Sequence, residues 1–159
     1  MDIKTSKIDF HKIKKSEIIK KYSLQSSENE YPVAGEKISA GFPAYTDNFK
    51  TDPISIDKTL VNKPESSFII QVQGESMKDA GIFPNSYIVV DTSIDPKDGN
   101  IIVARYFDEF VVKRIYISEN EAILKAENSE LNFPDIEINK DTDFEVWGVV
   151  TGTFFNFAK

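Results

Sequence analysis

The chain has no cysteine and only one histidine, His11, among its 159 residues. The absence of cysteine excludes disulfides, thiolate metal sites and cysteine catalysis, and it fits a reducing compartment. No apolar run approaches the roughly 18 residues that a membrane-spanning helix needs. The first residues also lack the apolar core of a secretory signal. We therefore expect a cytoplasmic protein with no membrane partner.

Sites for small cofactors are also missing from the sequence. His11 is not accompanied by histidine or acidic residues at metal-ligand spacing, and no glycine-rich phosphate loop is present. The acidic pairs near residues 135–143 are typical of the surface of a chain whose net charge is −7. We expect neither a metal nor a cofactor.

The negative charge is concentrated after the first forty residues. Residues 1–40 contain eight lysines against six acidic residues, whereas residues 41–159 contain eleven basic residues against twenty acidic ones. Binding to a nucleic-acid backbone needs a basic surface. The acidic body therefore argues against direct, sequence-specific DNA binding, and the lysines of the first segment are typical of a solvated face.

The first part of the chain shows little regular patterning. Residues 8–24 have a loose helical stripe of isoleucine and leucine, and residues 25–32 are typical of a linker. Residues 43–67 are polar and interrupted by prolines, which predicts extended chain with little regular structure. A DNA-reading helix-turn-helix needs two or three packed helices, and we do not expect one before residue 40.

From residue 67 onward the sequence alternates between short β-rich runs and turns rich in Gly, Pro, Asp and Asn. This pattern predicts a mainly β fold, a compact twisted or barrel-like sheet. A glycine-closed helical turn is expected at Ser76–Ala80, with Gly81 after it. The expected strands are 67–72, 87–90, 101–106, 110–117, 121–126 and 144–157.

Ser76 and Lys113, 37 residues apart, form the most informative pair in the chain. A serine needs a base to take its proton before it attacks a carbonyl. With one distant histidine and no cysteine, a lysine is the remaining base, as in known Ser-Lys variants of the catalytic triad. Strand alternation places Lys113 on the same face as Val111 and Ile115, an environment that favours the neutral amine.

Each residue of this pair also has a simpler interpretation. Lys113 can be a solvated lysine at the edge of a sheet, where lysine discourages aggregation. Ser76 can be the N-cap of a short helix. A nucleophile at a helix N-terminus would still have backbone N–H groups beside it to stabilise an oxyanion, so the capping and catalytic interpretations of Ser76 are compatible.

Four motifs, in order, resemble those of the LexA/UmuD family of self-cleaving Ser-Lys peptidases. The resemblance covers about residues 38 to 152. The family commonly has threonine two residues before the lysine, where this chain has Val111. The motifs are Ala40-Gly41-Phe42-Pro43, Gly74-Glu75-Ser76-Met77, Val112-Lys113-Arg114 and Trp147-Gly148-Val149-Val150.

The resemblance implies specific roles for these residues. Ser76 would be the nucleophile, Lys113 the general base, and Ala40–Gly41 the bond that is cut. Residues 1–40 would form a flexible arm removed by self-cleavage, and residues 41–159 the β-rich peptidase domain, acting as a homodimer. Cleavage would be stimulated by a recombinase filament on single-stranded DNA.

Without an expected helix-turn-helix, the chain is similar to the branch whose members serve error-prone DNA polymerases. The shortened protein would then join a Y-family polymerase for translesion synthesis in the SOS response. Two alternatives remain open: a truncated LexA-like or phage-repressor-like regulator, and a dimeric interaction module of the same fold without catalysis. A signal-peptidase-like enzyme would share the chemistry, but it would need a membrane anchor.

Overall fold

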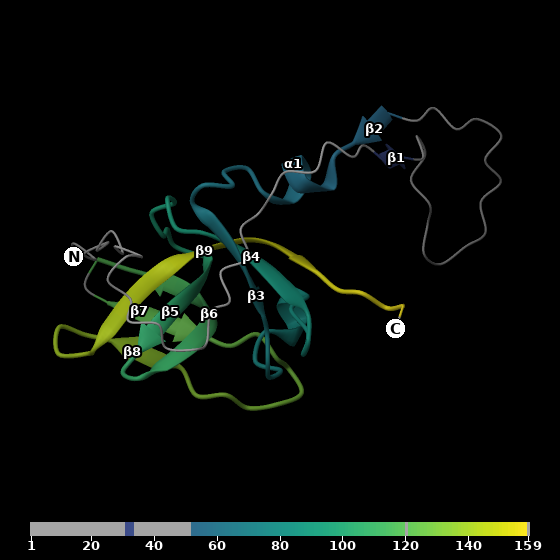
Figure 1. The fold of residues 1–159 in the computed structure, drawn as a ribbon. Helices are drawn as coiled ribbons and strands as arrows, with labels where there is room; N and C mark the ends of the chain where they lie inside the picture. Colours follow the sequence, from purple (N-terminus) through teal and green to yellow (C-terminus); the bar gives the residue numbers. More distant parts are fainter. Residues whose placement is uncertain (1–30, 34–51, 120, 159) are drawn as a thin grey trace.

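The computed structural model describes residues 31–33, 52–119 and 121–158. Its main body is one antiparallel sheet of seven strands in the order β3-β4-β9-β5-β6-β7-β8 (Figure 1). The strands are β3 (Ser67–Gln71), β4 (Tyr87–Asp91), β5 (Ile101–Tyr106), β6 (Glu109–Ile117), β7 (Ala122–Lys125), β8 (Ile136–Ile138) and β9 (Phe144–Phe154). The expected mainly β, twisted-sheet fold is therefore confirmed.

The long strand β9 joins the two halves of this sheet. Its first half pairs with β5 and its second half with β4, and Figure 1 shows it in yellow crossing the body. The register with β5 shifts between Val103 and Ala104, and the register with β4 shifts between Val89 and Val90. Such bulges increase local twist and bend a strand, so β9 curves around the core.

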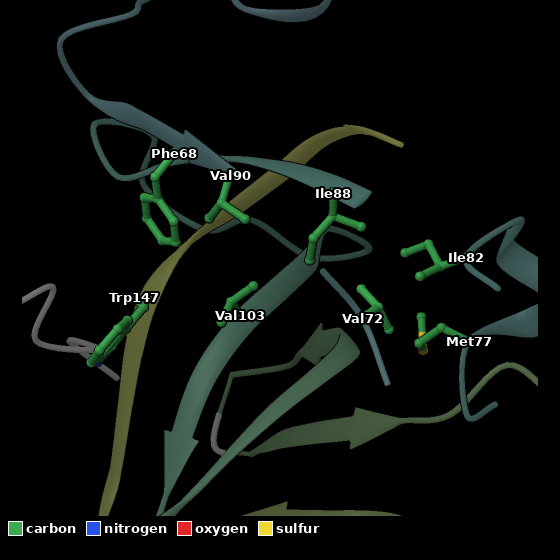
Figure 2. Close-up of a cluster of buried hydrophobic side chains, with 8 residues drawn as sticks. All are labelled: Phe68, Val72, Met77, Ile82, Ile88, Val90, Val103 and Trp147. Carbon is green, nitrogen blue, oxygen red and sulfur yellow. The ribbon is translucent and has the colours of Figure 1, made fainter. Parts of the chain in front are cut away.

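Alternate residues of the central strand β5 enter two separate hydrophobic clusters. Val103 belongs to a cluster with Val72, Met77 and Trp147, whereas Ile102 belongs to a second cluster built around Ile115 and Leu124. Because successive strand side chains point to opposite faces, both faces of the sheet are covered at its centre. Figure 2 shows the first cluster, with Met77 beside Val72 at one end and Trp147 at the other.

The polar region before the sheet contains more regular structure than the sequence indicated. A second, two-stranded sheet pairs β1 (Tyr31–Val33) with β2 (Asp52–Ile54). The helix α1 (Ile56–Leu60) follows, and the Ser55 hydroxyl accepts a hydrogen bond from the Lys58 amide. The expectation of little regular structure over 43–67 was wrong here, because this serine cap precedes a stretch without proline.

The structure also contains a strand that sequence reasoning missed. Residues Ile136–Ile138 form β8 at the edge of the sheet, paired with β7. Its acidic residues indicated plain surface, yet Ile138 is buried in the second cluster. The expected helix at 8–24 lies outside the described residues, as does the expected linker at 25–32 except for residues 31–32, which belong to strand β1 instead. Apart from β1, the region before residue 40, where no helix-turn-helix is expected, is also outside the described residues. No helix in the described ranges is long and apolar enough to cross a membrane.

Candidate active site

A cleft of about 1070 Å³ lies between strand β3 with the turn that follows it and the strands β5, β6 and β9. Both residues of the expected dyad line this cleft. Its wall is mostly apolar, since side chains of the first hydrophobic cluster reach it. The lining residues used below are Val72, Gly74, Ser76, Met77, Phe110, Val111, Lys113 and Trp147.

Ser76 lies in the tight turn between β3 and η1 (Lys78–Ala80), a 3-10 helix. Gly74 enters this turn with φ of 89°, a left-handed conformation that glycine adopts without a steric penalty. The next side chain, Met77, is buried in the first hydrophobic cluster and anchors the turn. The half-buried Ser76 is thereby held at the cleft.

The helical turn differs in detail from the sequence expectation. It is a three-residue 3-10 helix whose N-cap residue is Met77, which makes no side-chain capping bond. Ser76 is therefore not the N-cap, and a helix this short supplies no macrodipole of consequence. The expected glycine C-cap is confirmed, because Gly81 is left-handed with φ of 82°.

Lys113 lies on β6, which pairs with β5 on one side and β7 on the other. The side-chain environment is dry: Lys113 is 8% exposed. Burial lowers the pKa of its amine from 10.5, because a charged ammonium loses hydration in an apolar site. The alternative of a solvated sheet-edge lysine is wrong, because Lys113 is buried.

An aromatic ring covers the amine of Lys113. The Nζ atom lies 5.1 Å from the centroid of the Phe133 ring, which belongs to the connection between β7 and β8. A cation over a ring face is favourable by about 0.5–2 kcal/mol, which opposes neutralisation. Burial acts in the other direction and lowers the pKa of Lys113. Sequence reasoning missed Phe133, because no local pattern links it to Lys113.

The first residues of the same β7–β8 connection form hydrogen bonds with the turn that carries Ser76. The Glu127 amide donates to the Ser76 carbonyl at 2.7 Å, and the Asp79 amide donates to the Glu127 carbonyl at 2.9 Å. The Asn128 side-chain amide donates to the Glu75 carbonyl at 2.7 Å. These bonds give the irregular turn main-chain partners that it cannot find within its own short helix.

Two aromatic side chains form the wall of the cleft on the β6–β9 side. The rings of Phe110 and Trp147 meet edge to face with centroids 4.2 Å apart and an interplanar angle of 64°. Trp147 lies at the register shift of β9, between Val146 and Gly148, which pair with successive residues of β5. The bulge thus aims this ring into the cleft.

Ala40 and Gly41 lie outside the described residues. The strands that flank their segment are described: Val33, the last residue of β1, pairs with Asp52, the first residue of β2. The two residues that flank this segment, Val33 and Asp52, are therefore neighbours in the structure.

A serine hydroxyl and a desolvated lysine that line one cleft are the groups that Ser-Lys nucleophilic chemistry requires. A neutral amine can accept the serine proton, and the apolar wall keeps the amine neutral nearer to pH 7. The remainder of the cleft is open and largely apolar, which suits an extended peptide.

The chain belongs to the Peptidase S24-like family, whose model matches residues 32–151. It is 32% identical over 135 residues to the LexA repressor of Pasteurella multocida, which covers 84% of this chain and 63% of that protein. It is 31% identical over 127 residues to protein MucA of Salmonella typhimurium, covering 79% of this chain and 85% of that protein. This chain thus spans less than two thirds of the LexA repressor that it matches.

Proposed function

We propose that this protein cuts its own Ala40–Gly41 bond, with Ser76 as nucleophile and Lys113 as general base. Neutral Lys113 takes the proton of the Ser76 hydroxyl, and the Ser76 Oγ attacks the Ala40 carbonyl carbon. The resulting ammonium returns the proton to the Gly41 nitrogen as that bond breaks. Water then hydrolyses the acyl-serine, again with Lys113 as the base, and frees the Ala40 carboxylate.

The observation that carries this proposal is the environment of Lys113. A lysine at 8% exposure, with its pKa lowered by burial, lines the same cleft as the only serine in the matching motif. Within the described residues Lys113 forms no salt bridge, and burying an unpaired ammonium lowers stability. Titratable groups with a perturbed pKa cluster at functional sites. A purely structural role would be served better by an apolar residue.

Self-cleavage at alkaline pH tests the chemistry without any partner. The full chain, incubated at pH 10, should yield fragments of 1–40 and 41–159 by mass spectrometry, because raising the pH increases the neutral fraction of the amine. Ser76→Ala and Lys113→Ala should stay intact, whereas Ser118→Ala, a serine in an exposed turn after β6, should cleave like wild type. Wild-type protein that stays intact after long incubation would refute the proposal.

We further propose a UmuD-like role for the protein, as a homodimer. An activated recombinase filament on single-stranded DNA stimulates the cut, and the 41–159 fragment then joins a Y-family polymerase subunit for translesion synthesis. The similarity to MucA along 85% of its length supports this role. Adding filament at pH 7 should accelerate the same cut, and the fragment, but not Ser76→Ala protein, should co-purify with the polymerase subunit.

The LexA similarity favours a second candidate, a repressor-type regulator. The acidic balance of residues 41–159 opposes it, because a DNA surface must be basic. A gel-shift assay at low salt distinguishes the two candidates. Sequence-dependent retardation of DNA by the full chain would favour the regulator, and no retardation would favour the polymerase subunit.

A further inference from the structure

Glu127 contacts both halves of the cleft at once. Its backbone bonds to the serine turn on both sides, accepting from Asp79 and donating to the Ser76 carbonyl. Its carboxylate accepts from the Nε and Nη2 atoms of Arg114, the second at 3.1 Å. One residue therefore joins the turn that carries Ser76 to the strand that carries Lys113.

Arg114 is fixed at a second point on the sheet. Its Nη1 atom donates to the Gly99 carbonyl at 2.6 Å, in addition to the two bonds to Glu127. The Arg114 and Glu127 side chains are 27% and 24% exposed, and hydrogen bonding to Glu127 raises the pKa of Arg114. A forked, half-buried pair of this kind is stronger and more directional than an exposed surface pair.

Arg114 does not take part in the chemistry directly. It follows Lys113 on β6, so strand alternation points its side chain to the opposite face, and it does not line the cleft. Its bonds instead hold the β6 backbone at Lys113. Lys113 lines the cleft, so any shift of β6 relative to the turn changes the separation of base and nucleophile.

We propose that Glu127 and Arg114 are positioning residues that fix the separation of Ser76 and Lys113. We call the bridge formed by Glu127 and Arg114 the clamp. Its role rests on the proposed function of the dyad and deepens it. The two reacting residues are 37 positions apart on different elements, and a misplacement of about 1 Å can cost on the order of a hundredfold in rate. The clamp spans that gap through hydrogen bonds made by one residue, Glu127.

The test compares self-cleavage rates of full-length variants across pH 7 to 11. We expect Glu127→Gln and Arg114→Ala to lower the rate on the alkaline plateau by about 10- to 100-fold. The pH midpoint should not move, because the pKa of Lys113 is lowered by burial and not by this pair. The double variant should be no slower than the slower single variant, since both changes break one clamp.

A matched control removes a comparable forked pair that does not line the cleft. Arg105 binds Asp143 through both Nη atoms, at 2.9 and 2.7 Å, near the β5–β6 turn. Asp143→Ala should therefore cleave at the wild-type plateau rate. Thermal unfolding of every variant distinguishes a misplaced dyad from an unfolded protein. If Arg114→Ala does not fold, Glu127→Gln, which keeps the shape of the side chain, provides the test alone.

The outcomes separate the clamp from the dyad itself. Folded Glu127→Gln that cleaves at the wild-type plateau overturns the clamp and leaves the dyad standing. Additive losses in the double variant, or a shifted pH midpoint with an unchanged plateau, also overturn it. Wild-type protein that is inert at pH 10 overturns the proposed function, and the clamp with it.

Discussion

Lys113 of β6 lies directly opposite Ile102 of β5 in the register of the sheet. Ile102 is fully buried in the second hydrophobic cluster. Because directly opposed residues share a face of the sheet, Lys113 leaves its strand on the side of the second cluster, where it is buried, and it also lines the cleft. The environment of Lys113 is therefore set by strand pairing. Substitutions of Lys113, of the Phe133 ring above its amine and of Gly148 in the same sheet test this environment.

The first prediction concerns the pH dependence of self-cleavage. Because burial lowers the pKa of Lys113, the base should become neutral below pH 10.5. The rate should rise about tenfold per pH unit at low pH and reach a plateau at high pH. The midpoint of this rise should lie below pH 10.5. Rates from gel densitometry or mass spectrometry between pH 6 and 11 measure this profile. A midpoint above 10.5 would contradict the burial of the base.

The second prediction concerns stability and its sign. The pKa of Lys113 is lower in the folded state, so at neutral pH the folded protein carries an ammonium that its environment disfavours. That cost is fully present below the folded-state pKa and disappears as pH rises toward the unfolded value. In a Ser76→Ala background, Lys113→Met should raise the free energy of unfolding at pH 7 by about 1 kcal/mol, or about 2–4 °C in Tm.

The advantage of Lys113→Met should shrink as pH approaches 10.5. Urea unfolding at several pH values measures it. Lys125→Met on the neighbouring strand is the control with the opposite sign, because hydrogen bonding to Asp135 raises the pKa of Lys125. That substitution should give no stabilisation at pH 7. Equal stabilisation by both substitutions would show that hydrophobicity alone, and not the buried charge, is responsible.

The third prediction concerns the ring above the amine. Phe133→Ala should admit water to the Nζ atom of Lys113, from which the ring centroid lies 5.1 Å. Loss of hydration dominates the lowered pKa, so uncovering the amine should move its pKa back toward 10.5. The cleavage rate at pH 7 should fall several-fold, while the alkaline plateau should persist.

A pH–rate profile separates Phe133→Ala from the clamp variants. Phe133 acts on the midpoint, whereas Glu127 and Arg114 are proposed to act on the plateau. Leu131→Ala, an exposed apolar residue of the same connection, is the matched control and should leave both quantities unchanged. A midpoint that falls on removing Phe133 would show that the cation–π attraction, and not dehydration, dominates at the ring.

The sequence predicted those parts of the molecule that depend on local pattern. The runs at 67–72, 87–90 and 101–106 alternate or are bounded by turn residues, and β3, β4 and β5 form there. The apolar neighbours of Lys113 along its own strand also pointed correctly to burial. The assignment of Ser76 and Lys113 as a dyad stays a prediction, and both residues line the described cleft.

The missed features depend on contacts between distant residues. Phe133 and Glu127 reach the site only because β7 pairs with β6 and turns back beside the serine turn. Nothing local to either residue signals that contact. Local chemistry favours Ser76 as an N-cap. In the structure Met77 is buried in the first hydrophobic cluster and is itself the N-cap residue, so the helical turn begins at Lys78.

The last prediction tests the close packing that supports the cleft wall at Trp147. A Cβ atom added at Gly148 would lie 2.7 Å from the Val90 Cγ1 atom and 2.9 Å from the Asp91 carbonyl oxygen. The carbonyl belongs to the backbone of a paired strand, so it cannot yield without disturbing β4. Gly148→Ala should therefore cost about 1–3 kcal/mol of unfolding free energy and should slow cleavage, because β9 must shift beside Trp147.

Gly152→Ala on the same strand supplies the control. The nearest atom to its added Cβ is the Leu60 Cδ2 atom at 3.5 Å, an ordinary van der Waals contact. Both substitutions change the backbone entropy of one β9 residue in the same way, so their difference isolates the close approach. Urea denaturation should show Gly152→Ala near wild type and Gly148→Ala clearly below it. Equal midpoints would mean that β4 and β9 separate freely, and that the bulge at Trp147 does not depend on this contact.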